Sequence, residues 1–244
     1  MKKLLKHALA VCGLRLQRLP AGIPTGHDLE RDLRLVIGDK PGAVCIDAGA
    51  HHGDFTAAIL SCLVRPVVHA FEPAPEVFGK LKDRHAATPG VTLVQAGLAD
   101  QAGQLDLHVF SNAALNSFLP LTDESRQIFD SPVESSPTPA QLFRLDDYAR
   151  THGITQIDLL KIDTQGYELH VLRGAATLFT EERIRSVLVE LNFSNLYRGQ
   201  VPAHEVMGFL HGHSLQLVEC YEKCRLPPHL GWCTALFTRR SARP

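Results

Sequence analysis

The stretch Ala43–Thr56, which reads AVCIDAGAHHGDFT, constrains the fold more than any other part of the chain. A short apolar run ends at Asp47, a turn with Gly49 and Gly53 follows, and an apolar run at helical spacing comes next. This order predicts a buried strand, a tight turn and a crossover helix, which together form the first unit of a nucleotide-type binding crevice. Gly49 lets the backbone approach a ligand closely, and Gly53 lets the chain turn into the helix. The helix start offers free N–H groups to an anionic group.

The glycine pattern also narrows the ligand. A dinucleotide-binding turn reads G-x-G-x-x-G around a pyrophosphate, whereas this turn reads D-x-G-x-x-x-G. A ligand with an adenosine but no pyrophosphate fits this turn better. Glu72 ends the next buried run, VVHAFEP, at about the twenty-residue separation at which a carboxylate accepts hydrogen bonds from ribose hydroxyls. We therefore expect S-adenosylmethionine (SAM) as the cofactor, with an ordinary α/β crossover that binds no ligand as the alternative.

The later segments continue the alternation of strands and helices. Strand-like runs lie at residues 91–94, 105–110, 158–163 and 186–192, and helix-like runs lie at 75–85 and 202–211. Two final strand-like runs, at 215–221 and 232–238, are separated by a predicted loop, KCRLPPHLG, and suggest an antiparallel pair. The pattern predicts a doubly wound α/β sheet of about seven strands. Gly97 and Leu98, after the third strand, lie where an adenine ring would stack.

A second informative stretch, residues 157–175, reads IDLLKIDTQGYELHVLRGA. Asp163 ends its strand, Gly166 opens a helix, and Glu168 lies in the first helical turn, where the helix dipole favours a negative charge. If the strand order reverses beside the first strand, Asp163 and the turn after Asp47 end at the same edge of the sheet. Asp163 would then position the cofactor's amino group or a substrate hydroxyl. Its alternative role is to cap the following helix.

Two segments differ in composition from the rest. Residues 1–34 begin with a basic stretch that has no acid before Asp28, and we expect a helical segment that packs on the domain or contacts an anionic membrane surface. The remaining domain spans residues 35–240. Within it, residues 111–141 are rich in Ser, Pro, Asn and Asp, which predicts an insert that acts as a lid or a solvated loop. Asn116 and Ser117 are candidate substrate contacts in this insert.

Charge and cysteine usage limit the partners and the compartment. The net charge of −1 does not favour nucleic acid as a partner, and no apolar run has membrane-spanning length. The six cysteines form no disulfide framework, which suits the reducing cytoplasm. Cys220, Cys224, His229 and Cys233 offer zinc-binding side chains, but they lack a tight C-x-x-C pair.

The segments DAGAHHGDFT, AFEPAPEVFGKL, LDDYA, LLKIDTQGYELHVLRGA and VLVELN occur in an order and spacing that resemble the FkbM family of SAM-dependent methyltransferases. The resemblance covers Leu33 to Thr238. It implies a class I methyltransferase (Rossmann-like) fold and methyl transfer to a hydroxyl oxygen, often on a sugar, glycan or polyketide. The chain departs from the family at two positions, because Asn is usual where His51 stands and Glu is common where Gln165 stands.

The candidate site residues follow from these motifs and from the resemblance. The candidates for catalysis are Lys161, Asp163, Glu168 and Glu190. The candidates for cofactor binding are Asp47, Gly49, Ala50, His51, Gly53, Phe55, Thr56, Glu72, Pro73, Gly97, Leu98 and Asp163. The expected acceptor is a small molecule, a sugar or a glycan.

The sequence leaves the proton acceptor open. An alcohol is a poor nucleophile, so a group near it must accept its proton. Apart from the carboxylates Asp163, Glu168 and Glu190, the candidates are His51, His52 and His170. We assign no metal to the site, although a divalent ion held by Asp163, Glu190 and Asn192 would serve the same purpose by lowering the pKa of the alcohol.

Two other functions are consistent with parts of the sequence. A NAD-dependent oxidoreductase is disfavoured because the turn lacks the three-glycine pattern. A non-catalytic adenosine-binding domain is disfavoured by the carboxylates that end several strands. Binding of NAD rather than SAM, or binding of SAM without turnover, would distinguish these functions from a methyltransferase.

Overall fold

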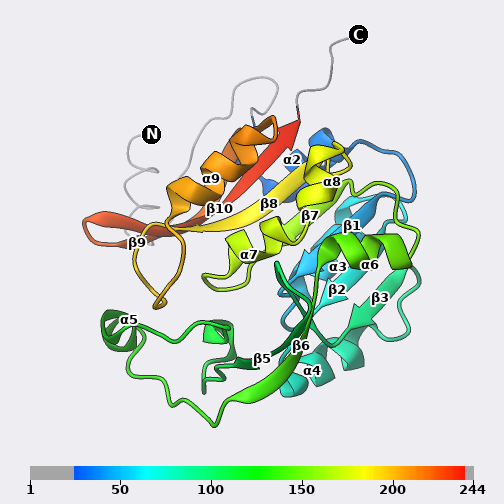
Figure 1. The fold of residues 1–244 in the computed structure, drawn as a ribbon. Coiled ribbons are helices and arrows are strands. Elements are labelled where there is room, and N and C mark those ends of the chain that lie inside the picture. Colours follow the sequence, from blue (N-terminus) through cyan, green and yellow to red (C-terminus); the bar gives the residue numbers. More distant parts are fainter. Residues whose placement is uncertain (1–24, 240–244) are drawn as a thin grey trace, which may run out of the picture.

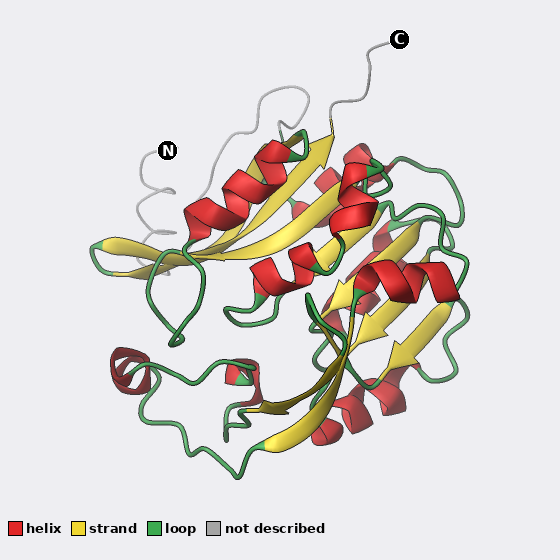
Figure 2. Cartoon of the chain, viewed as in Figure 1, coloured by secondary structure: helices red, strands yellow, loops and turns green. Residues whose placement is uncertain are grey.

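The computed structural model describes residues 25–239, which form a large twisted sheet with helices on both faces and a smaller sheet at one end (Figures 1 and 2). The large sheet contains β1 (Val44–Ala48), β2 (Val67–Phe71), β3 (Val91–Val94), β7 (Leu159–Ile162), β8 (Ser186–Asn192), β9 (Leu215–Leu226) and β10 (His229–Arg239). Its strand order is β3-β2-β1-β7-β8-β10-β9. All neighbours from β3 to β8 are parallel, whereas β10 is antiparallel to both β8 and β9.

This topology confirms the predicted doubly wound sheet with an antiparallel C-terminal strand pair, and it is the class I methyltransferase fold. Strand β1 lies between β2 and β7, so the strand order reverses beside it. Ligands bind outside the carboxyl ends of the strands at such a reversal. The turn after Asp47 and the turn at Asp163 therefore meet at one edge of the sheet, as the sequence predicts.

Helices cover both faces of the large sheet. The helices on one face are α2 (Leu29–Ile37), α3 (Asp54–Cys62) and α4 (Pro75–His85), and those on the other are α6 (Leu145–Thr151), α7 (Glu168–Arg173), α8 (Ala176–Thr180) and α9 (Ala203–Gly212) (Figure 1). The strands alternate between the two apolar layers. In β8, Leu188 packs with α2 and α3, while Val187 and Val189 pack with the helices of the other face.

The smaller sheet was not predicted. It consists of β4 (Gly97–Leu98), β5 (Gly103–Leu107) and β6 (Thr138–Phe143) in the order β4-β6-β5. The insert predicted at residues 111–141 contains η1 (Ala113–Leu115) and α5 (Asp123–Ile128), and its last residues belong to β6. Strand β6 carries a proline and little apolar alternation, so its pairing with β4 and β5 determines its conformation rather than its own sequence.

The prediction of a loop over the stretch KCRLPPHLG is wrong. Strands β9 and β10 extend through most of it, and His229 pairs directly with Leu226 around Pro227 and Pro228. Lys223, Cys224, Arg225 and Leu226 alternate between exposed and half-buried positions, but the two prolines that follow them are typical of a loop.

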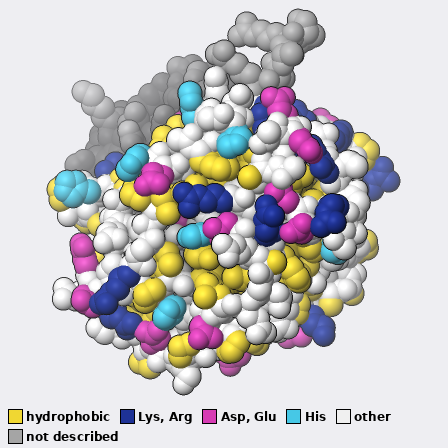
Figure 3. All heavy atoms as spheres, in the orientation of Figure 1, with side chains coloured by type: hydrophobic (Ala, Val, Ile, Leu, Met, Phe, Trp, Pro, Cys, Tyr) yellow, Lys and Arg dark blue, Asp and Glu magenta, His cyan; other side chains and the backbone are white. Residues whose placement is uncertain are grey.

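No helix among residues 25–239 is long and apolar enough to cross a membrane. The basic stretch expected to contact a membrane lies outside the described residues, which begin inside the predicted segment 1–34 and include α2. On the face shown in Figure 3, acidic and basic side chains are interspersed around a central group of apolar ones.

Candidate active site

The glycine turn after β1 lies directly against the turn after β7. Gly49 has a φ of +77°, and a Cβ at this position would lie 1.9 Å from the carbonyl oxygen of Asp163. The N–H groups of Gly49 and Ala50 donate to the carbonyl of Phe71 at 3.0 and 2.8 Å. The glycine therefore keeps the ends of β1, β2 and β7 together and leaves bare backbone facing the space above them.

A buried ion pair fixes this turn from below. Asp47 is fully buried and accepts a 2.7 Å hydrogen bond from Thr56 Oγ1. The ammonium of Lys161 lies 3.1 Å from the other carboxylate oxygen of Asp47 and donates to the carbonyl of Gly49 at 2.6 Å. Burial opposes the charge of Lys161, but Asp47 and Asp163 more than offset it and raise the pKa of the ammonium. Lys161 is therefore a cation at neutral pH and supports the turn.

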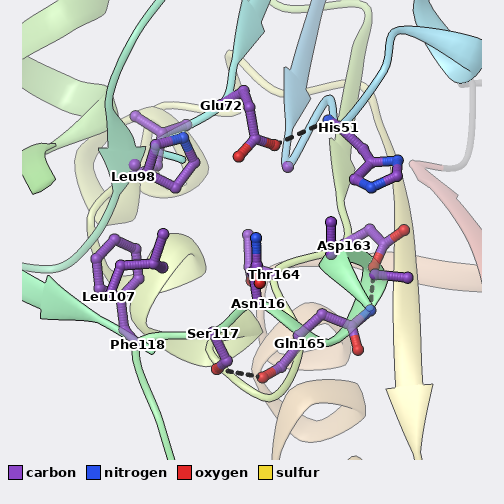
Figure 4. Close-up of a pocket in the computed structure, with 15 residues that line it drawn as sticks. His51, Glu72, Leu98, Leu107, Asn116, Ser117, Phe118, Asp163, Thr164 and Gln165 are labelled. Atoms are coloured by element: carbon purple, nitrogen blue, oxygen red, sulfur yellow. Dashed lines mark hydrogen bonds between the residues drawn. The ribbon is translucent and has the colours of Figure 1, made fainter. Parts of the chain in front are cut away.

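A cavity with an empty volume of about 770 Å³ opens beside Gly49, and we call it the nucleotide pocket (Figure 4). The predicted cofactor-binding residues that line it are Gly49, His51, Glu72, Pro73, Gly97, Leu98 and Asp163. The other predicted residues do not line it: Ala50 and Phe55 line a neighbouring cavity, and Asp47, Gly53 and Thr56 support the turn or the start of α3.

The nucleotide pocket fits a SAM molecule. The Glu72 carboxylate points into it (Figure 4) and accepts hydrogen bonds from the N–H groups of His51 and Ala74, both at 2.9 Å. Each oxygen keeps a lone pair for the hydroxyls of a ribose. Burial raises the pKa of Glu72 to about 7 even though these N–H groups favour the charged form. Leu98 and Phe118 supply the apolar surface that an adenine ring requires.

Several residues of this pocket are not evident from the sequence. The insert contributes Ala113, Ala114 and Phe118 as well as the predicted contacts Asn116 and Ser117. Leu107 comes from β5, and Thr164 and Gln165 come from the turn after β7. The signal for the last two was their position directly after Asp163; the insert residues carry no comparable local signal.

A second cavity, with an empty volume of about 1390 Å³, shares Gly49, His51 and Asp163 with the nucleotide pocket. We call it the carboxylate cavity because its charged lining is mainly acidic. Its ionisable residues, other than His51, are Asp28, Glu30, Asp54, Lys161, Asp163, Glu190 and Glu222. Two candidates for catalysis, Lys161 and Glu190, therefore lie in this cavity, and Asp163 lies in both.

Asp163 and Glu190 are linked by the side-chain amide of Gln165. The amide nitrogen donates to Asp163 Oδ1 at 2.7 Å and to Glu190 Oε2 at 3.2 Å. Asn192 Nδ2 donates to the same Glu190 oxygen at 3.2 Å. Burial and the nearby carboxylates of Asp163 and Glu168 raise the pKa of Glu190 well above its ordinary value. Asp163, which lines both cavities, and Glu190, which lines the carboxylate cavity, thus share one amide donor.

Glu168 lies outside both cavities. Its Oε1 accepts hydrogen bonds from the N–H groups of Thr164 and Gly166, both at 3.1 Å, and from the hydroxyl of Thr164. Burial raises its pKa to about 7. The geometry gives Glu168 the task of closing the turn after β7, and it leaves Glu168 outside the cavities that the other candidates for catalysis line.

The three candidate histidines are not equivalent. Only His51 lines the cavities; burial and the ring of His52, which lies 3.8 Å away, lower its pKa. The ring of His170 stacks on Tyr167 at 4.1 Å and lies 3.2 Å from Asp100. His51 is thus a neutral imidazole at neutral pH, and His170 lies on α7, outside the pocket.

Within residues 25–239, no group of three or more His, Cys, Asp or Glu side chains is arranged to hold a metal ion. The zinc arrangement considered for Cys220, Cys224, His229 and Cys233 is therefore not present. The amides of Gln165 and Asn192 both direct N–H donors at Glu190, an orientation that suits a hydrogen-bonded carboxylate.

Comparison with known proteins agrees with this geometry. The family described as "Methyltransferase FkbM domain" matches residues 47–220. The 2-O-methyltransferase NoeI of Sinorhizobium fredii is 25% identical over 178 residues, covering 70% of this chain and 72% of that protein. The 31-O-demethyl-FK506 methyltransferase FkbM of Streptomyces tacrolimicus is 30% identical over 211 residues, covering 76% and 77%. The hexuronic acid methyltransferase AglP of Haloferax volcanii is 24% identical over 162 residues, covering 66% and 61%. Since the family match covers more than half of the chain and includes both acidic strand ends of the pocket, this chain belongs to the FkbM family of SAM-dependent methyltransferases.

Proposed function

We propose that this enzyme transfers the methyl group of SAM to a hydroxyl oxygen of a sugar, a glycan or glycolipid, or a polyketide-like natural product. The observation that carries the proposal is the pair formed by Asp163, which lines both cavities, and Glu190, which lines the carboxylate cavity. A hydroxyl that enters from the carboxylate cavity meets a proton acceptor beside the cofactor. The names of the relatives, which include an O-methyltransferase, a hexuronic acid methyltransferase and an FK506 methyltransferase, support hydroxyl acceptors of this kind.

The residues of the nucleotide pocket would hold the cofactor in a defined orientation. Glu72 would accept hydrogen bonds from the ribose, and the bare backbone at Gly49 would face the amino acid moiety. Asp163, about two-fifths exposed, has a free carboxylate edge for the cofactor's amino group or the acceptor hydroxyl. SAM supplies a methyl group on a sulfonium, which is a good leaving group, so the main task of the protein is to align the acceptor oxygen with the methyl carbon.

Proton acceptance is the second task. The acceptor O–H must lose its proton as the new bond forms, and general bases contribute most when their pKa is near the working pH. The raised pKa of Glu190 brings this carboxylate toward that range. Lys161 is already bonded to Asp47 and Gly49, and we assign it to supporting the turn.

The insert is proposed to select the acceptor. Its residues Asn116, Ser117 and Phe118 form one wall of the nucleotide pocket, so changes in the insert reach the site. We propose the cytoplasm as the compartment; the expected N-terminal segment 1–34 includes part of α2, which packs on the large sheet. The described cysteines form no disulfide, which is consistent with the reducing conditions there.

Calorimetry with SAM and NAD, followed by a turnover assay, tests the proposal. We expect SAM to bind and NAD not to bind. S-adenosylhomocysteine should be released in the presence of at least one acceptor from a panel of methyl glycosides of glucose, galactose, mannose and rhamnose and a polyhydroxylated macrolide. Asp163→Asn should abolish turnover. Binding of NAD in place of SAM, or near-normal turnover by Asp163→Asn, would overturn this mechanism.

A further inference from the structure

The side chain of Gln165 makes hydrogen bonds to several residues in and around the candidate active site. It lies between β7 and α7 with a φ of +54°, a conformation that is unusual for a residue with a side chain. Its amide nitrogen donates to Asp163 and to Glu190, at 2.7 and 3.2 Å (Figure 4 shows the bond to Asp163). One neutral side chain thus bridges two carboxylates that belong to different strands.

The orientation of this amide is fixed by its partners. Ionised carboxylates only accept hydrogen bonds, so the NH₂ end of Gln165 must face Asp163 and Glu190. The opposite end, Oε1, accepts a 2.9 Å hydrogen bond from the hydroxyl of Tyr197. The backbone carbonyl of Gln165 accepts a 2.7 Å bond from Ser117 Oγ (Figure 4). The insert, the segment after β8 and the turn after β7 therefore all hold this residue.

The Gln165 bridge reduces the repulsion between the carboxylates of Asp163 and Glu190. Two carboxylates at close range repel each other unless a donor or a proton lies between them. The groups that face the pair from the surrounding elements are His51, Lys161, Glu168, Tyr197 and Cys233. Lys161 lies 3.8 Å from Asp163, but it is already bonded to Asp47 and Gly49. The Gln165 amide is the group that donates to both carboxylates at once.

We infer that Gln165 is a positioning residue for methyl transfer, which holds Asp163 and Glu190 as a hydrogen-bonded pair so that the pair accepts the proton of the acceptor hydroxyl. The acceptor oxygen forms a bond to the methyl carbon while the carbon–sulfur bond breaks and its electron pair stays on sulfur. The hydroxyl proton moves to the carboxylate pair and later leaves to water. The inference rests on the proposed function, because it names the group that serves the hydroxyl.

The identity of the residue matters because a glutamate would act differently. In the FkbM family, Glu is common at this position. An ionised glutamate has no hydrogen to donate, so it would add a third negative charge beside Asp163 and Glu190. Gln165 keeps the size and the bond to Tyr197 while it supplies donors. The pair is therefore expected to titrate at lower pH with glutamine than with glutamate or with a side chain that cannot donate.

Two substitutions separate this role from a structural one. Gln165→Met keeps most of the side-chain volume and removes both donors, and Gln165→Glu keeps the shape but adds a charge. Gln104→Met is the matched control, because Gln104 is exposed on β5, away from both cavities. For each protein we would measure the Kd for SAM by calorimetry, and kcat and KM with the methyl glycosides of the panel as a function of pH.

We expect Gln165→Met to lower kcat about 100-fold, the typical effect of misplacing a reacting group by about 1 Å. The Kd for SAM should change less than about fivefold, so that the loss falls on kcat. The acid limb of the pH profile should move up by about one pH unit, because the carboxylates lose a donor that favours their charged form. Gln165→Glu should show a shift in the same direction, and Gln104→Met should behave as the unmodified enzyme.

Three results would overturn the inference. In the first, kcat of Gln165→Met stays within about threefold of the unmodified value. In the second, the pH profile does not move. In the third, the loss is entirely in the Kd for SAM, which would make Gln165 a cofactor-binding residue.

A measurement that needs no turnover keeps the question separate from the proposed function. If the unmodified enzyme binds SAM but methylates none of the panel, the proposed acceptor class is refuted, while the role of the Gln165 bridge is still open to test. Carbon-13 NMR titration of the labelled Asp and Glu side-chain carboxyls then decides. A higher titration midpoint for Glu190 in Gln165→Met supports the bridge, and an unchanged midpoint overturns it.

Discussion

Replacing Gly49 with alanine places a methyl group where another part of the backbone already lies. The new Cβ would be 1.9 Å from the carbonyl oxygen of Asp163, and contacts shorter than 3.0 Å essentially do not occur in real structures, so the two turns must separate by about 1 Å. The φ of +77° adds about 1–2 kcal/mol for a residue with a side chain, and relief of the overlap adds about 1–3 kcal/mol. We therefore expect a loss of roughly 3 kcal/mol in the free energy of unfolding.

The same displacement should impair the site. A domain of this size loses about 2–4 °C of Tm per kcal/mol, so thermal unfolding should occur about 6–12 °C lower in Gly49→Ala. The turn forms the contact between the nucleotide pocket and the carboxylate cavity. Calorimetry at a temperature where the variant is folded should therefore show SAM binding weaker by at least about tenfold.

Gly79→Ala is the matched control for this prediction. Gly79 lies in α4, and a Cβ there would meet no atom within 4 Å. Alanine should raise the stability by about 0.5–1 kcal/mol, because glycine is unfavourable inside a helix. If Gly49→Ala melts within about 2 °C of the unmodified protein and binds SAM with the same Kd, the reasoning about the close approach of the two turns is refuted.

Three further predictions concern the acidic groups. Burial raises the pKa of Glu72 to about 7, so SAM should bind more tightly as the pH rises through this value. Glu72→Gln should lose that pH dependence, and calorimetry at pH 8 should show SAM binding about tenfold more weakly to this variant. Equal affinity of the two proteins at pH 8 would contradict the role of the carboxylate. Burial also raises the pKa of Glu168 from 4.5 to about 7, so the folded state binds a proton more tightly than the unfolded state, and stability falls as the pH rises across this interval. Urea unfolding should find Glu168→Gln more stable than the unmodified protein by up to about 3 kcal/mol at pH 8, with no difference near pH 4.5 and with turnover retained; loss of turnover would instead make Glu168 catalytic. The charged side chains that line the carboxylate cavity are acidic apart from one lysine, so a negatively charged acceptor should be disfavoured. The kcat/KM for methyl glucoside should exceed that for methyl glucuronide by at least about tenfold. A preference for the uronic acid would show that acceptors enter elsewhere.

Segments whose own residues determine their conformation were predictable. Helix α4 begins at Pro75 and ends at His85, as its apolar spacing and its proline indicate. Strand β8 spans Ser186–Asn192, as its continuous apolar run indicates. Strand β8 is buried along most of its length, whereas α4 buries one face through Val77, Leu81 and His85, and each kind of burial leaves its own apolar pattern in the sequence.

Elements that depend on distant partners were not predictable. Strand β6 is a strand because β4 and β5 pair with it, and the two prolines at the turn between β9 and β10 hide how far the ladder pairing of these strands extends. The same limit applies to the site. The acidic strand ends, Glu72 and Asp163, can be recognised in the sequence because each follows a buried apolar run. The hydrogen bonds of Gln165 to Glu190 and to Tyr197 join residues 25 and 32 positions apart and leave no local pattern.

The smaller sheet has a consequence for how this enzyme could change its acceptor during evolution. Gly97 and Leu98 in β4 line the nucleotide pocket, and β4 is paired with Leu142 and Phe143 of β6, at the far end of the insert. The wall of the pocket and the base of the insert are thus one folded unit. Recombination between family members can exchange the outer part of the insert freely, but a crossover inside β6 would detach the cofactor wall together with it. New acceptor preferences are therefore expected to arise by replacement of residues 119–137, which follow the pocket residue Phe118 and precede β6.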